Sequence, residues 1–133
     1  MRLNPYLTFD GNCEAAMRFY HGLLGGDLQI MKYNEMPDTS MVPDGMQDRV
    51  AHAGIKTDGF WLQGSDNIGQ MPFDGYKGFT IQIDLGDIDK GKALFDRLSD
   101  GGSVIMPYGE QFWARGFGMA TDKFGVPWMI HVE

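Results

Sequence analysis

The sequence has few of the side chains on which disulfide, metal and nucleophilic chemistry depend. Its 133 residues include one cysteine, Cys13, and three histidines. A single cysteine forms no internal disulfide, which favours a reducing compartment. No apolar run approaches the ~20 residues that a bilayer span requires, and the first residues lack the long apolar segment of a signal peptide. We therefore expect a cytoplasmic protein with no membrane partner.

Positive charge is also scarce. Eleven Lys and Arg residues stand against 18 Asp and Glu residues, which gives a formal net charge of -7. Proteins that bind nucleic acid need clustered basic side chains to neutralise phosphates, whereas these are scattered singly along the chain. The sequence therefore predicts no nucleic-acid partner.

Apolar residues and glycine are plentiful by comparison. The apolar fraction is 43%, enough for a core, and the length suits one compact domain over residues 1–133. The 19 glycines lie between apolar runs rather than in linkers. This placement is typical of a protein built from hairpins and sharp turns.

The two halves of the sequence repeat the same pattern. Asn12, Phe19 and Gly25 in the first half match Asp87, Phe95 and Gly101 in the second, at separations of 75, 76 and 76 residues. In each half a strand-like run precedes a helical pattern and three strand-like runs follow it. The sequence thus predicts an α+β domain of two βαβββ modules, at about 1–66 and 77–133.

The boundaries of the expected elements follow from periodicity and turn residues. Asn12 and Asp87 are the expected helix N-caps, and glycine pairs at 25–26 and 101–102 end the two helices. Tight turns are expected at 57–59 and 122–125. The segments 34–48 and 65–76 have no period, and long loops of this kind often border sites. The expected helices are 13–24 and 88–100, and the expected strands are 3–9, 28–33, 49–56, 60–63, 78–85, 104–107, 112–121 and 126–132.

Several runs resemble one known family over essentially the whole chain. They are Leu3-Asn4-Pro5-Tyr6-Leu7-Thr8-Phe9, Gly11-Asn12-Cys13-Glu14-Ala15, Val50-Ala51-His52-Ala53, Gly64-Ser65-Asp66 and, most specifically, Phe112-Trp113-Ala114-Arg115-Gly116-Phe117-Gly118 with Phe124-Gly125-Val126-Pro127-Trp128. The chain is similar to the PhnB-like proteins of the vicinal-oxygen-chelate superfamily, which includes glyoxalase I and the bleomycin-resistance proteins. The resemblance implies paired βαβββ modules that form a curled mixed sheet around a cleft, and a homodimer.

The resemblance also implies where a metal would bind. In metal-dependent members the first and last strands of each module supply the ligands, and the matching positions here are Asn4, Gln63, Phe79 and Met129. A divalent ion prefers imidazole or carboxylate ligands. Two amides, a phenyl ring and a thioether supply no charge to the ion. We therefore expect no metal and no other cofactor.

Three further residues have both a structural and a functional interpretation. His52 lies mid-strand, either as a half-buried side chain bonded to backbone or as a base or hydrogen-bond donor that lines the cleft. Arg115 is either a solvated charge in a hairpin or a binder of an anionic group. Cys13 is interpreted as a small residue at a helix start, because no histidine lies near it in sequence to activate a nucleophile.

Other enzyme classes find no support in the motifs. One name used within the resembling family is a demethylubiquinone methyltransferase. A nucleotide-type site needs a glycine-rich turn that precedes a helix, whereas both glycine pairs follow their helices. No Gly-x-Ser-x-Gly motif is present either.

Aromatic and amphipathic residues are more numerous than one small core can hold. By strand alternation Trp61 and Gln63 share a face, as do Asn4, Tyr6 and Thr8. This composition is typical of a small-molecule pocket. The sequence therefore predicts a metal-free small-molecule-binding protein with an unidentified ligand; the alternatives are a metal-dependent lyase or dioxygenase of the same fold, and an interaction protein whose aromatic surface is a subunit interface. The expected ligand-binding residues are Asn4, Tyr6, His52, Trp61, Gln63, Phe79, Trp113, Arg115 and Met129, and no catalytic residue is assigned.

Overall fold

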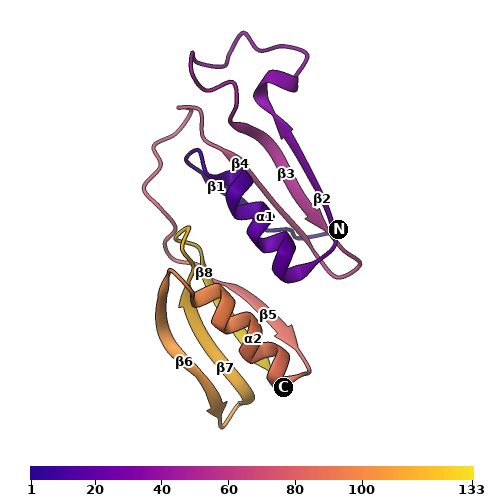
Figure 1. Ribbon diagram of the computed structural model, residues 1–133, viewed down its shortest axis with the longest axis vertical. Helices are drawn as coiled ribbons and strands as arrows, with labels where there is room; N and C mark the ends of the chain where they lie inside the picture. Colours follow the sequence, from indigo (N-terminus) through magenta and orange to yellow (C-terminus); the bar gives the residue numbers. More distant parts are fainter. The chain divides into compact units, whose positions relative to one another are not determined.

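The computed structural model describes all 133 residues, which form two compact units, Met1–Asp74 and Gly75–Glu133. Each unit has the order strand, helix and three strands, as the repeat in the sequence predicts (Figure 1). The first unit contains β1 (Tyr6–Phe9), α1 (Cys13–Leu24), β2 (Asp27–Lys32), the short 3₁₀ helix η1 (Tyr33–Glu35), β3 (Val50–Lys56) and β4 (Trp61–Asp66). The second contains β5 (Ile81–Leu85), α2 (Ile88–Ser99), β6 (Ser103–Gln111), β7 (Ala114–Thr121) and β8 (Pro127–Val132).

The two sheets share one topology. The N-terminal sheet has the strand order β1-β4-β3-β2, and the C-terminal sheet has the order β5-β8-β7-β6. In each sheet the first and last strands of the unit pair in parallel, and the other pairs are antiparallel. The predicted α+β fold of two βαβββ modules with mixed sheets is therefore confirmed.

One helix covers one face of each sheet (Figure 1). In α1 the buried side chains Ala16, Met17 and Tyr20 recur at helical spacing and pack on the N-terminal sheet. In α2 the buried positions are Gly91, Phe95 and Leu98. Strand β4 alternates between half-exposed and buried residues, as a strand with one covered face does. Each sheet therefore keeps a second face that its own helix does not cover.

The two predicted helix starts are capped in different ways. Asp87 accepts a hydrogen bond from the backbone N–H of Lys90 at 2.9 Å, so its role as N-cap is confirmed. The prediction for Asn12 is right in position and wrong in mechanism, because its side chain makes no capping hydrogen bond. The buried carboxylate of Asp66 instead accepts from the N–H groups of Gly11 and Cys13, at 2.9 and 3.0 Å. The first turn of α1 is thus held by the end of β4.

Several strand boundaries differ from the expected ones. Strands β1 and β5 begin at Tyr6 and Ile81, later than the expected residues 3 and 78, and β6 continues to Gln111 rather than ending at 107. A register shift between Met31 and Lys32 interrupts the β2–β3 pairing. Strand alternation predicts that Val50 shares a face with His52, but the bulge breaks the alternation, and Val50 is buried whereas His52 is half-exposed.

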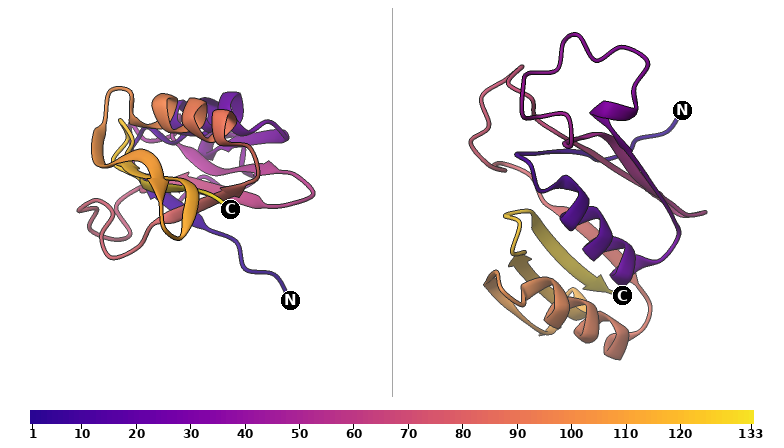
Figure 2. Two further views of the ribbon diagram at one scale, coloured as in Figure 1. Left: turned by 90° about the horizontal axis from the view of Figure 1, so that it is seen from below. Right: turned by 45° about the horizontal axis from the view of Figure 1, so that its top comes forward.

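The long irregular segments expected at 34–48 and 65–76 are present, apart from η1 and the last residue pair of β4. The first of them projects from the ends of β2 and β3 in Figure 2. The predicted tight turns at 57–59 and 122–125 are confirmed by the hydrogen bonds from Thr57 N–H to the Phe60 carbonyl and from Gly125 N–H to the Asp122 carbonyl, both 2.9 Å. No helix in the structure has the length and apolar character needed to cross a membrane.

Candidate functional site

The candidate site lies on the face of the N-terminal sheet that α1 does not cover. Directly paired residues on adjacent strands project to the same face, and the register brings Gly54 of β3 opposite both Gln29 of β2 and Gln63 of β4. Gln63 is in turn paired with Tyr6 of β1. A row of residues therefore crosses all four strands, and polar or aromatic side chains flank the one glycine.

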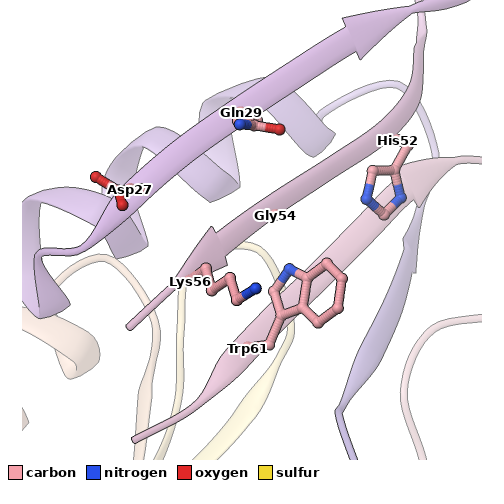
Figure 3. Close-up of a pocket in the computed structure, with 6 residues that line it drawn as sticks. All are labelled: Asp27, Gln29, His52, Gly54, Lys56 and Trp61. Carbon is pink, nitrogen blue, oxygen red and sulfur yellow. The ribbon is translucent and has the colours of Figure 1, made fainter. Parts of the chain in front are cut away.

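A pocket of about 230 Å³ opens on this face (Figure 3). Strand β2 contributes two polar residues, β3 contributes three residues, and β4 contributes an aromatic wall. The lining residues are Asp27, Gln29, His52, Gly54, Lys56 and Trp61. The pocket thus combines one large ring with both signs of charge and an amide, the mixture from which orienting contacts to a small molecule are made.

Gly54 provides the floor of the pocket. A Cβ atom at this position would lie only 2.8 Å from Nε1 of Trp61, which is closer than real side-chain contacts allow. The absence of a side chain therefore lets the indole lie over β3. The ammonium group of Lys56 stands 5.1 Å from the centroid of the Trp61 ring and points toward it in Figure 3. This cation–π contact holds the aromatic wall in place.

His52 and Tyr6 form the polar end of the same face. The hydroxyl group of Tyr6 lies 3.3 Å from Nδ1 of His52, and the two ring centroids are 5.8 Å apart. His52 is therefore bonded to another side chain and not to the backbone, unlike the first of the two interpretations given for it. His52 is half-buried and extends from β3 on the side of Trp61 (Figure 3).

The other predicted residues of the N-terminal unit lie at the margin of the pocket. Gln63 comes near Gly54, with its Cγ 3.8 Å from the position of a Cβ there, but it does not line the cavity. Asn4 precedes β1, and the next residue, Pro5, accepts a hydrogen bond from the N–H of Gln63 at 3.1 Å. The structure therefore brings together Tyr6, His52, Trp61 and Gln63, with Asn4 outside the strand.

Four predicted residues belong to the C-terminal unit. Met129 lies mid-strand in β8, opposite Gln82 of β5. Phe79 precedes β5 and is 42% exposed. Trp113 lies in the β6–β7 turn and is 45% exposed. Arg115 donates to the carbonyl groups of Glu133 and Gly86, the latter at 3.0 Å, so its guanidinium group joins the ends of two strands.

Comparison with known proteins agrees with this architecture. Residues 2–130 match the model of the glyoxalase/bleomycin resistance protein/dioxygenase superfamily. The chain belongs to this superfamily. It is 41% identical to protein YjdN of Escherichia coli, over 99% of this chain and 95% of that protein. The crystal structure of protein PA1353 from Pseudomonas aeruginosa is 40% identical, covers 100% of this chain and 98% of its own, and superimposes with a TM-score of 0.92.

A more distant structure shows the same fold. A protein of Bacillus cereus, described as a putative 3-demethylubiquinone-9 3-methyltransferase and PhnB protein, is 23% identical, covers both chains completely and has a TM-score of 0.81. The resemblance noted in the sequence is therefore confirmed as membership of the glyoxalase/bleomycin-resistance superfamily.

The superfamily includes metal-dependent enzymes, but the donor set here does not fit a metal. Of the four positions that the resemblance implies, Gln63 and Met129 lie on β4 and β8, whereas Asn4 and Phe79 precede β1 and β5. The residues paired with Gln63 and Met129 across the parallel strands are Tyr6 and Gln82. None of these side chains is an imidazole or a carboxylate, the ligands that divalent ions favour. No group of three His, Cys, Asp or Glu side chains in the chain is arranged to hold an ion. We therefore derive no reaction step through a metal.

The surroundings of Cys13 favour a structural role over a nucleophilic one. Its side chain, at the first position of α1, is fully buried. Burial, and secondarily the charges of Asp66 and Glu14, raise the pKa of the Cys13 thiol well above its ordinary value. A buried thiol that stays protonated is neither reactive nor available as a ligand, so the structural interpretation of Cys13 is favoured.

Sequence reasoning missed four of the six residues that line the pocket. Gln29, Gly54 and Lys56 lie within the expected strands 28–33 and 49–56, whereas Asp27 lies one residue before the first of them. Their convergence depends on strand order, because β2 lies next to β3 and not next to β1. The spacing of Asp27, Gln29 and Met31 at every second residue is the one local sequence signal that these side chains share the open face of the N-terminal sheet.

Proposed function

We propose that this superfamily member binds a small organic molecule, without a metal ion, on the open face of the N-terminal sheet. The observation that carries the proposal is the pocket over Gly54, in which the Trp61 indole faces a set of polar side chains. As part of the same proposal the protein acts in the cytoplasm as a homodimer and binds neither nucleic acid nor membrane. The single cysteine supports the cytoplasmic location and the net charge of -7 supports the absence of a nucleic-acid partner, whereas the homodimer follows from the resemblance to the family.

The size of the pocket limits the ligand. Drug-sized ligands occupy pockets of roughly 300–1,000 Å³. The pocket measures about 230 Å³, which suits a single ring with short substituents. A flat apolar part of the ligand would lie against Trp61, since an indole over a glycine offers a broad and rigid surface.

The polar side chains determine how such a ligand is oriented. Gln29 both donates and accepts hydrogen bonds, and His52 has a ring nitrogen bonded to Tyr6 and a second one for the ligand. Asp27 and Lys56 place opposite charges on the same rim. A ligand with an aromatic ring and polar groups at its edge therefore fits better than a purely apolar one.

The test is a thermal-shift screen of aromatic metabolites and aromatic antibiotics, carried out with and without a chelator. Binding at 100 times Kd stabilises the folded state by about 2.7 kcal/mol, which raises the melting temperature measurably. Hits should be weakened at least tenfold by Trp61→Ala and unaffected by Phe60→Ala, which removes an exposed ring just outside the pocket. Hits that respond equally to both substitutions, or that need added metal, would contradict the proposal.

The variant Gln63→Leu tests whether the Gln63 amide contacts the ligand or has a structural role in the core. We expect Gln63→Leu to weaken ligand binding by about 1–3 kcal/mol through a lost hydrogen bond and to leave folding nearly intact, since Gln63 is half-exposed at the margin of the pocket. Isothermal titration with a screening hit measures the first effect and thermal unfolding the second. A large loss of stability with unchanged affinity would make Gln63 a structural residue.

The alternative of a metal-dependent lyase or dioxygenase is tested in parallel. Titration of the purified protein with nickel, zinc and manganese should give no stoichiometric binding, because the positions that the resemblance implies for metal ligands are two amides, a phenyl ring and a thioether (Asn4, Gln63, Phe79 and Met129). No group of three His, Cys, Asp or Glu side chains is arranged to hold an ion. One ion bound per chain by cleft side chains would replace the proposal with a metal-dependent function.

A further inference from the structure

The open face of the C-terminal sheet carries a row of chemically active side chains that the proposed function does not use. Asp84 of β5 lies opposite His131 of β8, and His131 lies opposite Phe117 of β7. Because directly paired residues project to the same side, the three side chains form one row across three strands. Helix α2 covers the other face of these strands, where Phe95 packs beneath Gly118.

The hydrogen bonds of this row fix the state of the imidazole. Nδ1 of His131 lies 2.9 Å from Oδ1 of Asp84, and Gln82 donates from its Nε2 to the same oxygen at 2.8 Å. An ionised carboxylate only accepts, so Nδ1 is the protonated nitrogen of the ring. In the neutral imidazole Nε2 is then an acceptor with a defined direction.

Aromatic rings continue the row beyond the imidazole. The ring of Phe117 meets the His131 ring edge to face at 6.4 Å, and the indole of Trp113 meets Phe117 at 5.4 Å. Phe112 lies against Trp113 at 4.8 Å. Phe117 is buried, whereas Trp113 is 45% exposed and Phe112 is 97% exposed. An oriented acceptor nitrogen thus adjoins an aromatic surface that is open to solvent.

Arg115 adds positive charge to the same face. It lies two residues before Phe117 on β7, and its guanidinium group donates to the carbonyls of Gly86 and Glu133, next to the ends of the strands that carry Asp84 and His131. A positive charge near the row favours a ligand whose hydroxyl group is acidic.

From these contacts we infer that the C-terminal sheet binds a phenolic compound. The phenol hydroxyl donates to Nε2 of His131, and the aromatic ring packs on the exposed face of Trp113, which the buried ring of Phe117 supports. Asp84 is the positioning residue, because it holds the tautomer in which Nε2 accepts. The inference does not rest on the proposed function, since the pocket of the N-terminal sheet shares none of these residues.

The experiment uses 4-nitrophenol as the probe and 4-nitroanisole, which lacks the hydroxyl group, as its control. We expect the unchanged protein to bind 4-nitrophenol at least tenfold more tightly than 4-nitroanisole, with the absorption band of the phenol shifted toward that of the phenolate. His131→Phe keeps a ring against Phe117 and should abolish both the preference and the shift. Equal affinity for the two probes in the unchanged protein would overturn the inference.

Asp84→Leu tests the positioning role, because the preference for the hydroxyl group is a readout that a merely structural role would not change. Asparagine would not test it, since its carbonyl oxygen could still accept from Nδ1 of His131 and from Nε2 of Gln82 as Oδ1 of Asp84 does. Leucine removes this acceptor, so Nδ1 is no longer held protonated and Nε2 is no longer held as an acceptor. The preference for 4-nitrophenol should therefore disappear while affinity for 4-nitroanisole is kept. Retention of the preference in this variant would overturn the inference.

Two more variants locate the probe and separate this site from the N-terminal pocket. Trp113→Ala should weaken both probes, because it removes the shared aromatic surface. Trp61→Ala should change neither, whether or not it abolishes binding of the hits from the screen. If binding of 4-nitrophenol followed Trp61 and not Trp113, the inference would be overturned while the proposed function stood.

Discussion

Trp61 lies over the backbone of Gly54, with its Nε1 2.8 Å from the position that a Cβ at residue 54 would occupy. Glycine here is a packing requirement and not a conformational one, because its φ is not in the left-handed region. The shape of the pocket therefore depends on the absence of one methyl group.

Gly54→Ala should displace the indole and change the pocket without unfolding the protein. The obstructing atom belongs to a side chain that can move, so we expect a stability change of about 1 kcal/mol or less and at least a tenfold loss of ligand affinity. Titration calorimetry and thermal unfolding measure the two effects. Gly59→Ala is the control, because the nearest atom to a Cβ there is 3.9 Å away. Unchanged affinity in the first variant would show that Trp61 does not define the pocket.

Asp66 should be among the most sensitive positions for folding. Its buried carboxylate accepts from the N–H groups of Gly11, Cys13 and Val50, at 2.9, 3.0 and 2.9 Å. Asp66→Ala leaves these donors unpaired, which costs about 3 kcal/mol or more of the free energy of unfolding. Urea denaturation measures the loss, with Asp44→Ala on the exposed loop as the matched control. Equal midpoints for the two variants would contradict the assigned role.

The two helix starts should differ in their response to alanine. Asp87→Ala removes the bond to the Lys90 N–H and should cost about 1 kcal/mol. Asn12→Ala removes no capping bond, so its cost should be smaller than half of that. The difference in the free energy of unfolding between the variants is the measurement. A larger effect at Asn12 would mean that its side chain caps α1 after all.

Because the thiol of Cys13 is buried, we expect the free energy of unfolding to depend on pH in the alkaline range. Burial raises the pKa of Cys13 from its ordinary value of 9.0, so the unfolded chain loses this proton at a pH where the folded chain keeps it. The stabilisation is fully present below pH 9.0 and declines above it, by about 1.4 kcal/mol per pH unit for one proton.

Comparison with Cys13→Ala isolates the contribution of the thiol, because lysines and tyrosines titrate in the same range in both proteins. Urea unfolding at a series of alkaline pH values should give a steeper decline for the unchanged chain than for the variant. Parallel declines would show that the thiol ionises equally well in the folded state.

The sequence predicts this fold well because its signals are local. The helix from Cys13 to Leu24 is bounded by an apolar period and by Gly25, whose φ of 72° no other residue adopts easily. The turn at Asp122 is likewise contained within four residues. Such patterns can be recognised without knowing which residues come into contact in the folded chain.

The parts that sequence reasoning missed are those that long-range pairing creates. The donors at the start of α1 are satisfied by Asp66, which lies 53 residues beyond Cys13, and not by the adjacent Asn12. Asp84 and His131 meet across 47 residues through the parallel register of β5 and β8. The polar rim of the pocket exists because β3 lies between β2 and β4 and so joins the side chains of all three strands on one face. None of these partners can be found from spacing alone.

The common register of the two sheets has a consequence for how their faces can be altered. The last pairs of the two parallel ladders, Phe9–Asp66 and Leu85–Val132, correspond to each other. One residue earlier, the pair Thr8–Ser65 in the N-terminal sheet corresponds to Asp84–His131 in the C-terminal sheet. Thr8→Asp with Ser65→His would therefore graft the carboxylate–imidazole pair onto the N-terminal half at the same strand positions. Each sheet can thus carry the side chains of the other at equivalent backbone positions. A comparison of the two sheets within one chain would then separate the effect of the side chains from the effect of the fold.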